Sequence, residues 1–140
     1  MKKSEKILTA KKFSTREDWL NALADEFRII FFNGKVATEL PKIRVSCGFP
    51  KGRRTAIGQC WSNSCSKDKT YEIFIHPGEA DGLRVGDILL HECIHAAVGV
   101  ECGHRGAFRK VALKCGLTGA MTATTAGERL KETLGRLIEK

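Results

Sequence analysis

The chain has 140 residues, a hydrophobic content of 42% and a formal net charge of +8. This length can bury one core but is too short for two ordinary domains, so we expect a single compact domain. Apolar runs such as 29–32 and 88–90 fall far below the roughly 20 residues that span a bilayer, which excludes a membrane-spanning helix.

The N-terminal residues are basic, and only Ile7 to Ala10 separate them from further lysines, so the apolar core of a signal peptide is missing. We therefore expect a cytoplasmic protein, in the host cytoplasm if it is phage-encoded. Residues 1–12 are expected to be a flexible basic segment and residues 13–140 the folded domain. Further basic residues follow in a Gly-rich loop, namely Lys51, Arg53 and Arg54. Such clusters indicate either non-specific DNA contact or a solvated basic surface.

The sequence Ser14-Thr15-Arg16-Glu17 has capping-box form and precedes apolar residues at helical spacing, which predicts a first amphipathic helix ending at Asn33-Gly34. Three β-favouring stretches then follow, at 43–47, 56–61 and 71–76. Turn residues separate them, and we expect a three-stranded, mostly antiparallel sheet.

Residues 83–100 contain no proline and are apolar almost all round, which predicts a helix buried in the middle of the fold. A turn at Gly103 and Gly106 precedes another amphipathic helix, which Gly116 closes. A second capping box, Thr125 to Glu128, predicts the start of the last helix. This order of helices and strands predicts an α+β fold.

The six cysteines are expected to be reduced, because the chain shows no secretion signal and has enough apolar residues for a core. The sequence contains no Cys-x-x-Cys pair, so a zinc ribbon or a thioredoxin-type redox centre has no support. A metal site must therefore be sought among the histidines.

His91-Glu92-Cys93-Ile94-His95 places two imidazoles at i and i+4, on one face of the expected helix and close enough to share a zinc ion. Glu92 lies about 100° round the helix, where its carboxylate can act as a general base on a water at the metal. Polar groups buried on an apolar helix cost several kcal/mol unless they are paired or bind metal. The spacing thus predicts a zinc site with His91 and His95 as ligands.

A catalytic zinc takes three protein ligands and keeps one position open. The metzincin pattern is excluded, because Val98 and Glu101 stand where its glycine and third histidine belong. The remaining candidates for the third ligand are Glu101, Cys102, His104 and His76. We favour His104, because the turn at Gly103 can return an imidazole to the metal from a new direction.

These residues resemble the SprT-like (Spartan-type) zinc metallopeptidases, in particular the short phage and prophage-encoded members. The resemblance covers roughly residues 43 to 130 and lies in separate motifs: Ile88 to Ala97, Gly103-His104 with Phe108, Val45 to Pro50, Ile57 to Trp61, Glu72 to Pro77, Gly116-Leu117 and Met121 to Thr124. Arg105 stands where the family usually has a glycine.

The resemblance implies a minimal zincin-like fold, peptide-bond hydrolysis, and an edge strand that holds an extended protein or peptide substrate beside the metal helix. We expect a monomeric zinc metalloendopeptidase with metal ligands His91, His95 and His104 and with Glu92 as general base. Arg105 and Tyr71 are weak candidates for stabilising the oxyanion. Two alternatives remain open: a zinc-containing basic module that binds DNA or a protein without catalysis, and a zinc hydrolase acting on another bond.

Overall fold

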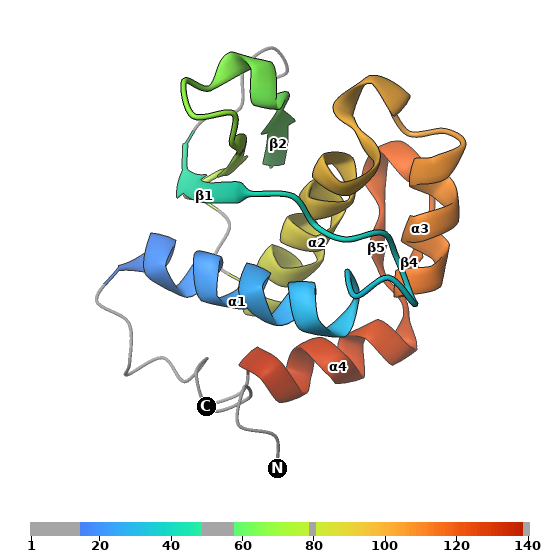
Figure 1. Cartoon of the computed structure of the whole chain (residues 1–140). Helices are drawn as coiled ribbons and strands as arrows, with labels where there is room; N and C mark the ends of the chain where they lie inside the picture. The colour runs from blue at the N-terminus through green and yellow to red at the C-terminus, as the bar shows by residue number, and fades with distance from the viewer. Residues whose placement is uncertain (1–14, 49–57, 79–80, 139–140) are drawn as a thin grey trace.

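The structure is a computed structural model that describes residues 15–48, 58–78 and 81–138. Within these ranges the chain forms four α-helices and a three-stranded mixed sheet, which confirms the α+β class (Figure 1). The expected flexible segment 1–12, the basic residues Lys51, Arg53 and Arg54, and the start of the strand expected at 56–61 lie outside the described residues.

The first helix, α1 (Arg16–Ile30), buries an apolar face formed by Leu20, Leu23 and Phe27. Its N-cap is Thr15, whose hydroxyl accepts a hydrogen bond from the backbone N–H of Asp18 at 3.1 Å. This contact satisfies one of the N–H groups that a helix leaves unpaired at its start. The expected helix is confirmed, with its cap one residue later than the capping box from Ser14 to Glu17 indicated.

The sheet consists of β1 (Ile43–Cys47), β2 (Gly58–Trp61) and β3 (Tyr71–Ile75), in the order β1-β3-β2. Strand β3 is antiparallel to β2 but parallel to β1. The expectation of a mostly antiparallel sheet is therefore wrong for one of the two pairs. A parallel pair needs a connection that returns to the same end of the sheet, and here the segment containing β2 and the 3₁₀-helix η3 (Asn63–Cys65) makes that return.

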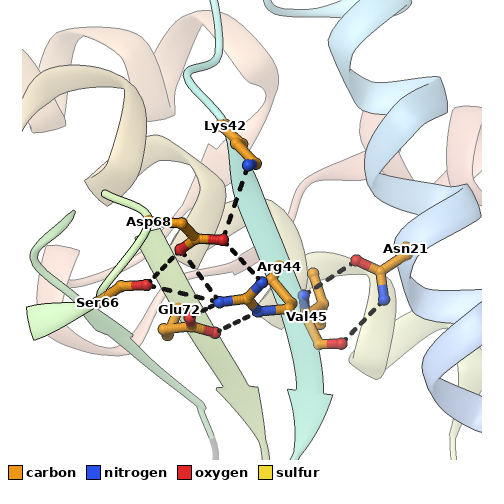
Figure 2. A network of polar contacts seen from close by, with 7 residues as sticks. All are labelled: Asn21, Lys42, Arg44, Val45, Ser66, Asp68 and Glu72. Carbon is orange, nitrogen blue, oxygen red and sulfur yellow. Dashed lines mark hydrogen bonds and ion pairs between the residues drawn. The ribbon is translucent and has the colours of Figure 1, made fainter. Parts of the chain in front are cut away.

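Polar side chains hold β1 on both sides (Figure 2). Arg44 lies opposite Glu72 in the parallel register, and its guanidinium contacts the carboxylates of Glu72 and Asp68. On the other side, Asn21 of α1 donates to the carbonyl of Val45 at 2.9 Å and accepts from its N–H at 3.0 Å. Helix α1 thus covers the outer edge of β1, and β2 is the edge strand on the opposite side of the sheet.

The helix α2 (Gly82–Val98) runs through the middle of the molecule, as its all-round apolar sequence predicts (Figure 1). Asp81 caps it by accepting from the N–H of Leu83 at 3.0 Å, and it ends at Gly99, which has φ 99°. The sheet and α1 pack against α2, as do α3 (Ala107–Cys115) and α4 (Glu128–Ile138). The central helix therefore carries the core and presents the His91 and His95 pair within it.

The C-terminal part contains local structure that the sequence did not predict. Strands β4 (Leu117–Thr118) and β5 (Thr125–Ala126) form a two-stranded antiparallel ribbon around the 3₁₀-helix η5 (Met121–Ala123). Thr125 pairs with Thr118, so the last helix begins at Glu128 and not at the expected capping box. Tertiary pairing here outweighs a local capping preference. None of the helices in the described ranges combines the length and apolar character needed to cross a membrane.

Candidate metal centre

The side chains of His91, His95 and His104 converge at one point. Nε2 of His104 lies 3.3 Å from Nε2 of His91 and 3.1 Å from Nε2 of His95. The first two histidines lie one turn apart on α2, where the i, i+4 spacing places them on one face. The structure thus brings together the three histidines that the sequence indicated as ligands.

Two glycines with positive φ, one on each side of His104, bring its side chain to this point. The 3₁₀-helix η4 (Val100–Cys102) follows α2, and Gly103 then adopts φ 61° and Gly106 φ 58°. These left-handed conformations suit glycine, because a Cβ atom would be strained there. His104 lies within the turn, three residues before the start of α3 at Ala107. The fold-back that the sequence indicated at Gly103 is present.

The histidine cluster fits a metal ion. Zinc ligands lie about 2.0–2.1 Å from the ion, so two nitrogens at adjacent tetrahedral positions are about 3.3–3.4 Å apart. The separations of 3.1 and 3.3 Å come close to this value. An imidazole is a common ligand for zinc, copper, iron and nickel. The three side chains therefore form a group able to hold a metal ion, and the donor set by itself suits more than one metal.

Burial keeps these imidazoles in the form that binds metal. It lowers the pKa of His91 to about 3 and that of His95 to about 4, and it also lowers the pKa of His104. The neighbouring imidazoles add to the first two shifts. All three rings are then neutral at pH 7, and a neutral imidazole is the ligand form of histidine.

Phe108 of α3 packs against all three imidazoles. Its ring centroid lies 4.9 Å from that of His91, 4.4 Å from that of His95 and 5.1 Å from that of His104. The Phe108 side chain is fully buried. An aromatic ring in this place restricts the rotamers of the three side chains, so the cluster is held in position by packing as well as by the backbone.

A hydrogen bond to Thr124 orients His91. Nδ1 of His91 lies 2.7 Å from Oγ1 of Thr124, and both residues are buried. When Nδ1–H donates to this hydroxyl, the lone pair of Nε2 is free for a metal, which is the arrangement usual for ligating histidines. Nδ1 of His95, in contrast, is buried and has no hydrogen-bond partner in the described part of the chain.

Glu92 lies beside the cluster and is 6% exposed. Burial raises the pKa of its carboxyl group to about 8, whereas a nearby cation would oppose that shift. The side chain approaches Gly58 of β2 closely: a Cβ atom on Gly58 would lie 3.1 Å from Oε2 of Glu92 and 2.7 Å from Cγ2 of Ile88. Because Gly58 has no side chain, the carboxylate of Glu92 fits next to the edge strand β2.

The histidines and Glu92 open onto a cleft of about 640 Å³. It is lined by residues of α2, by residues 58–60 of β2, by residues 122–124, and by Val100 and His104. The cleft thus places a cluster able to hold metal, a buried carboxylate and the edge strand of the sheet around one space. A cleft with convergent polar groups of this kind is the candidate functional site of the described part of the chain.

The other residues that the sequence singled out lie elsewhere. The thiol of Cys102 donates to the carbonyl of Val98 at 3.3 Å, and Glu101 and Tyr71 line a separate cavity of about 480 Å³. Nδ1 of His76 accepts a hydrogen bond from the N–H of Gly78. Arg105 is exposed and is not among the residues that line the cleft. Neither candidate for oxyanion stabilisation, Tyr71 or Arg105, is thus among the described residues that line the cleft.

Thr124 and Arg84 are among the residues of the cleft to which the sequence assigned no role. Thr124 falls in a segment, Met121 to Thr124, that the sequence marked only as part of the resemblance, and nothing local connects it to His91. Arg84 follows the helix start and forms an ion pair with Asp87, a spacing common on solvated helices. Only the tertiary structure shows that both line the same cleft.

Comparison of the chain with protein-family models, with curated proteins and with solved structures finds no match. The resemblance to the SprT-like metallopeptidases therefore rests on the sequence motifs, and the geometry of the site is the independent argument about function.

Proposed function

We propose that the chain is a zinc metallopeptidase of the SprT-like type with a minimal zincin-like fold. The observation that carries the proposal is the convergence of three Nε2 atoms, from His91, His95 and His104, in a cleft that also contains Glu92. A bound zinc ion at these nitrogens would lower the pKa of a water molecule and polarise a carbonyl group.

In this proposal Glu92 is the general base. Its carboxylate takes a proton from the attacking water and later delivers that proton to the leaving amine. The position of Glu92 supports this role, because it is adjacent to His91 in sequence but projects to a different side of α2 and lines the cleft. A group that titrates near the working pH suits both acceptance and donation of a proton.

The edge strand β2 supports a peptide as the substrate. It pairs with β3 along one side only in the described sheet, and its residues 58–60 line the cleft. An extended peptide can add to such an edge by main-chain hydrogen bonds, which would place a backbone carbonyl beside the histidines. The covered edge of β1, where Asn21 already holds Val45, offers no equivalent place.

The competing proposal is a binding module whose zinc site is purely structural. Such a module needs no open coordination position at the metal. Such a site closes its coordination with a fourth protein ligand. The described residues show three histidines in the cluster, and the thiol of Cys102, the obvious fourth ligand, faces the carbonyl of Val98 instead. This geometry favours the hydrolase. DNA contact through the basic residues outside the described ranges stays a prediction.

The test of the proposal is Glu92→Gln, with Glu101→Gln as the matched control because Glu101 is an exposed carboxylate outside the cleft. Zinc content should stay near one ion per chain in both variants. Cleavage of an unfolded protein should fall by about 10² to 10⁴ in Glu92→Gln and stay unchanged in the control. Assays with and without single-stranded DNA should be run in parallel.

Two outcomes would count against the hydrolase. Equal cleavage by the wild type and Glu92→Gln would rule out Glu92 as the base. Zinc binding without cleavage of any unfolded substrate would favour the binding module.

A further inference from the structure

Arg84 occupies a place in the cleft that the proposed reaction does not explain. It lies near the start of α2, and within the described part of the chain it is the only lysine or arginine that lines this cleft. Its side chain is 30% exposed and is therefore half-buried. A cation that lines the cleft can contact whatever the cleft binds.

The guanidinium is held by two acceptors on one of its nitrogens. Nη1 donates to the carboxylate of Asp87 and to the backbone carbonyl of Thr124, the latter at 3.1 Å. Asp87 in turn accepts from the N–H of Ala126 at 3.4 Å and is almost fully buried. These contacts tie Arg84 to α2 and to the segment leading into β5, which fixes the group in space.

The other edge of the guanidinium, formed by Nε and Nη2, has N–H donors without an acceptor among the described residues. An arginine side chain carries five N–H groups, two of them on Nη1. The described residues provide acceptors for Nη1 only, so Nε–H and both N–H groups of Nη2 are left for another partner. The Nε and Nη2 edge forms a fork that matches the two oxygens of a carboxylate, which makes this side chain a receptor for that group.

The distance from the histidines suggests where on a substrate the carboxylate would lie. The Cα atom of Arg84 precedes that of His91 by about two turns of α2, or roughly 10 Å along the helix axis. An extended peptide advances about 3.4 Å per residue, so the same peptide can reach both places within about three residues. Thr124 contacts both groups, since its hydroxyl meets His91 and its carbonyl meets Arg84.

We propose that Arg84 is a specificity-determining residue that binds a carboxylate of the substrate peptide about three residues from the bond beside the histidines. This inference rests on the proposed peptidase function. The carboxylate belongs either to an Asp or Glu side chain or to the C-terminus of the peptide, and the same fork accepts both.

Peptide binding tests the inference without relying on cleavage. Peptide binding is measured with the Glu92→Gln protein by fluorescence anisotropy, first with zinc and again after chelation. In the metal-free state the peptide carboxylate cannot bind to the ion, so any preference that persists does not come from the metal. The probes are short, labelled, extended peptides with Glu or Gln placed at successive positions and an amidated C-terminus. A Gln peptide with a free C-terminus distinguishes the two sources of the carboxylate.

The expected result is that one acidic peptide binds about tenfold more tightly than its amide counterpart, since a hydrogen bond to a charged group contributes this much. The preference should vanish in Arg84→Gln and persist in Arg105→Gln, an exposed arginine outside the described cleft wall. The double variant Arg84→Gln/Asp87→Asn leaves no unpaired buried carboxylate and should also lose the preference, which separates recognition from misfolding.

Equal binding of acidic and amide peptides, or a preference that survives in Arg84→Gln, would overturn the inference. The two proposals can fail separately. Cleavage by the wild type without any acidic preference removes the role of Arg84 and leaves the peptidase. A preference that depends on Arg84 in a protein that cleaves nothing leaves the role of Arg84 and removes the peptidase.

Discussion

Thr124 and His91 are joined by a hydrogen bond of 2.7 Å between Oγ1 and Nδ1, although 33 positions separate them in sequence. The same threonine gives its carbonyl oxygen to Arg84. The segment after η5 therefore supports both the histidine cluster and the guanidinium of Arg84.

Thr124→Val keeps the shape of the side chain but removes the acceptor for Nδ1–H of His91. Zinc affinity should fall by about 10- to 100-fold, the usual cost of losing a hydrogen-bond partner of a ligating histidine. Thr124→Ser should retain most of the affinity. A competition titration with a chromogenic chelator measures both. Thr122→Val is the control, because Thr122 makes no hydrogen bond to a histidine among the described residues. Equal losses for Thr122→Val and Thr124→Val would refute a specific role of Thr124.

His104→Ala removes the one proposed zinc ligand that does not come from α2. Zinc affinity should fall by more than about 100-fold, which exceeds the cost of losing a partner of a ligand. Cys102→Ala should leave the affinity near that of the wild type, because its thiol contacts the carbonyl of Val98 and not the cluster. The same chelator competition compares the two variants. A comparable loss in Cys102→Ala would mean that the thiol binds the metal.

Gly58→Ala tests the close approach of β2 to Glu92. The added Cβ atom would lie 2.7 Å from Cγ2 of Ile88, so the Ile88 side chain, the strand or the helix must move. Overpacking of this kind costs about 1–3 kcal/mol in the free energy of unfolding. On the proposed role of Glu92 as general base, its displacement should also lower peptide cleavage by up to about 10²-fold while zinc stays bound. Urea denaturation and a cleavage assay measure the two effects.

Gly135→Ala is the matched control for that variant. Gly135 lies within α4, and a Cβ atom there would meet nothing within 4 Å. Replacing a glycine inside a helix by alanine should raise the free energy of unfolding by about 1 kcal/mol. Activity should not change. If Gly58→Ala behaved like Gly135→Ala in both assays, the narrow space beside Glu92 would have no functional importance.

The cysteines should differ sharply in reactivity towards iodoacetamide. The thiolate is the reactive form, so a raised pKa leaves less of it at a given pH. Burial raises the pKa of Cys115 to about 12 and also raises that of Cys93, which is fully buried, whereas Cys65 is exposed. At pH 8, mass spectrometry should find Cys65 alkylated long before Cys93 and Cys115. In denaturant all six should react. Rapid labelling of Cys93 in the native protein would contradict the packing of α2.

Local sequence was enough to determine the central helix and two of the three histidines in the cluster. The i, i+4 spacing of His91 and His95 is a property of any α-helix, and the apolar residues around them already predict burial. His104 was also within reach of sequence reasoning, because two nearby glycines allow the backbone conformations that a tight return requires.

The tertiary structure alone decided the order of the strands, the partners of the cluster and the walls of the cleft. Strand β3 lies between β1 and β2, a pairing that depends on long-range contacts, and Thr125 pairs with Thr118 where a helix start was expected. Thr124 and Arg84 acquire their roles by lying next to residues that are distant in the chain. Periodicity and capping describe only near neighbours, whereas these contacts form because burying the apolar faces of α2, α3 and α4 together brings remote segments to one place.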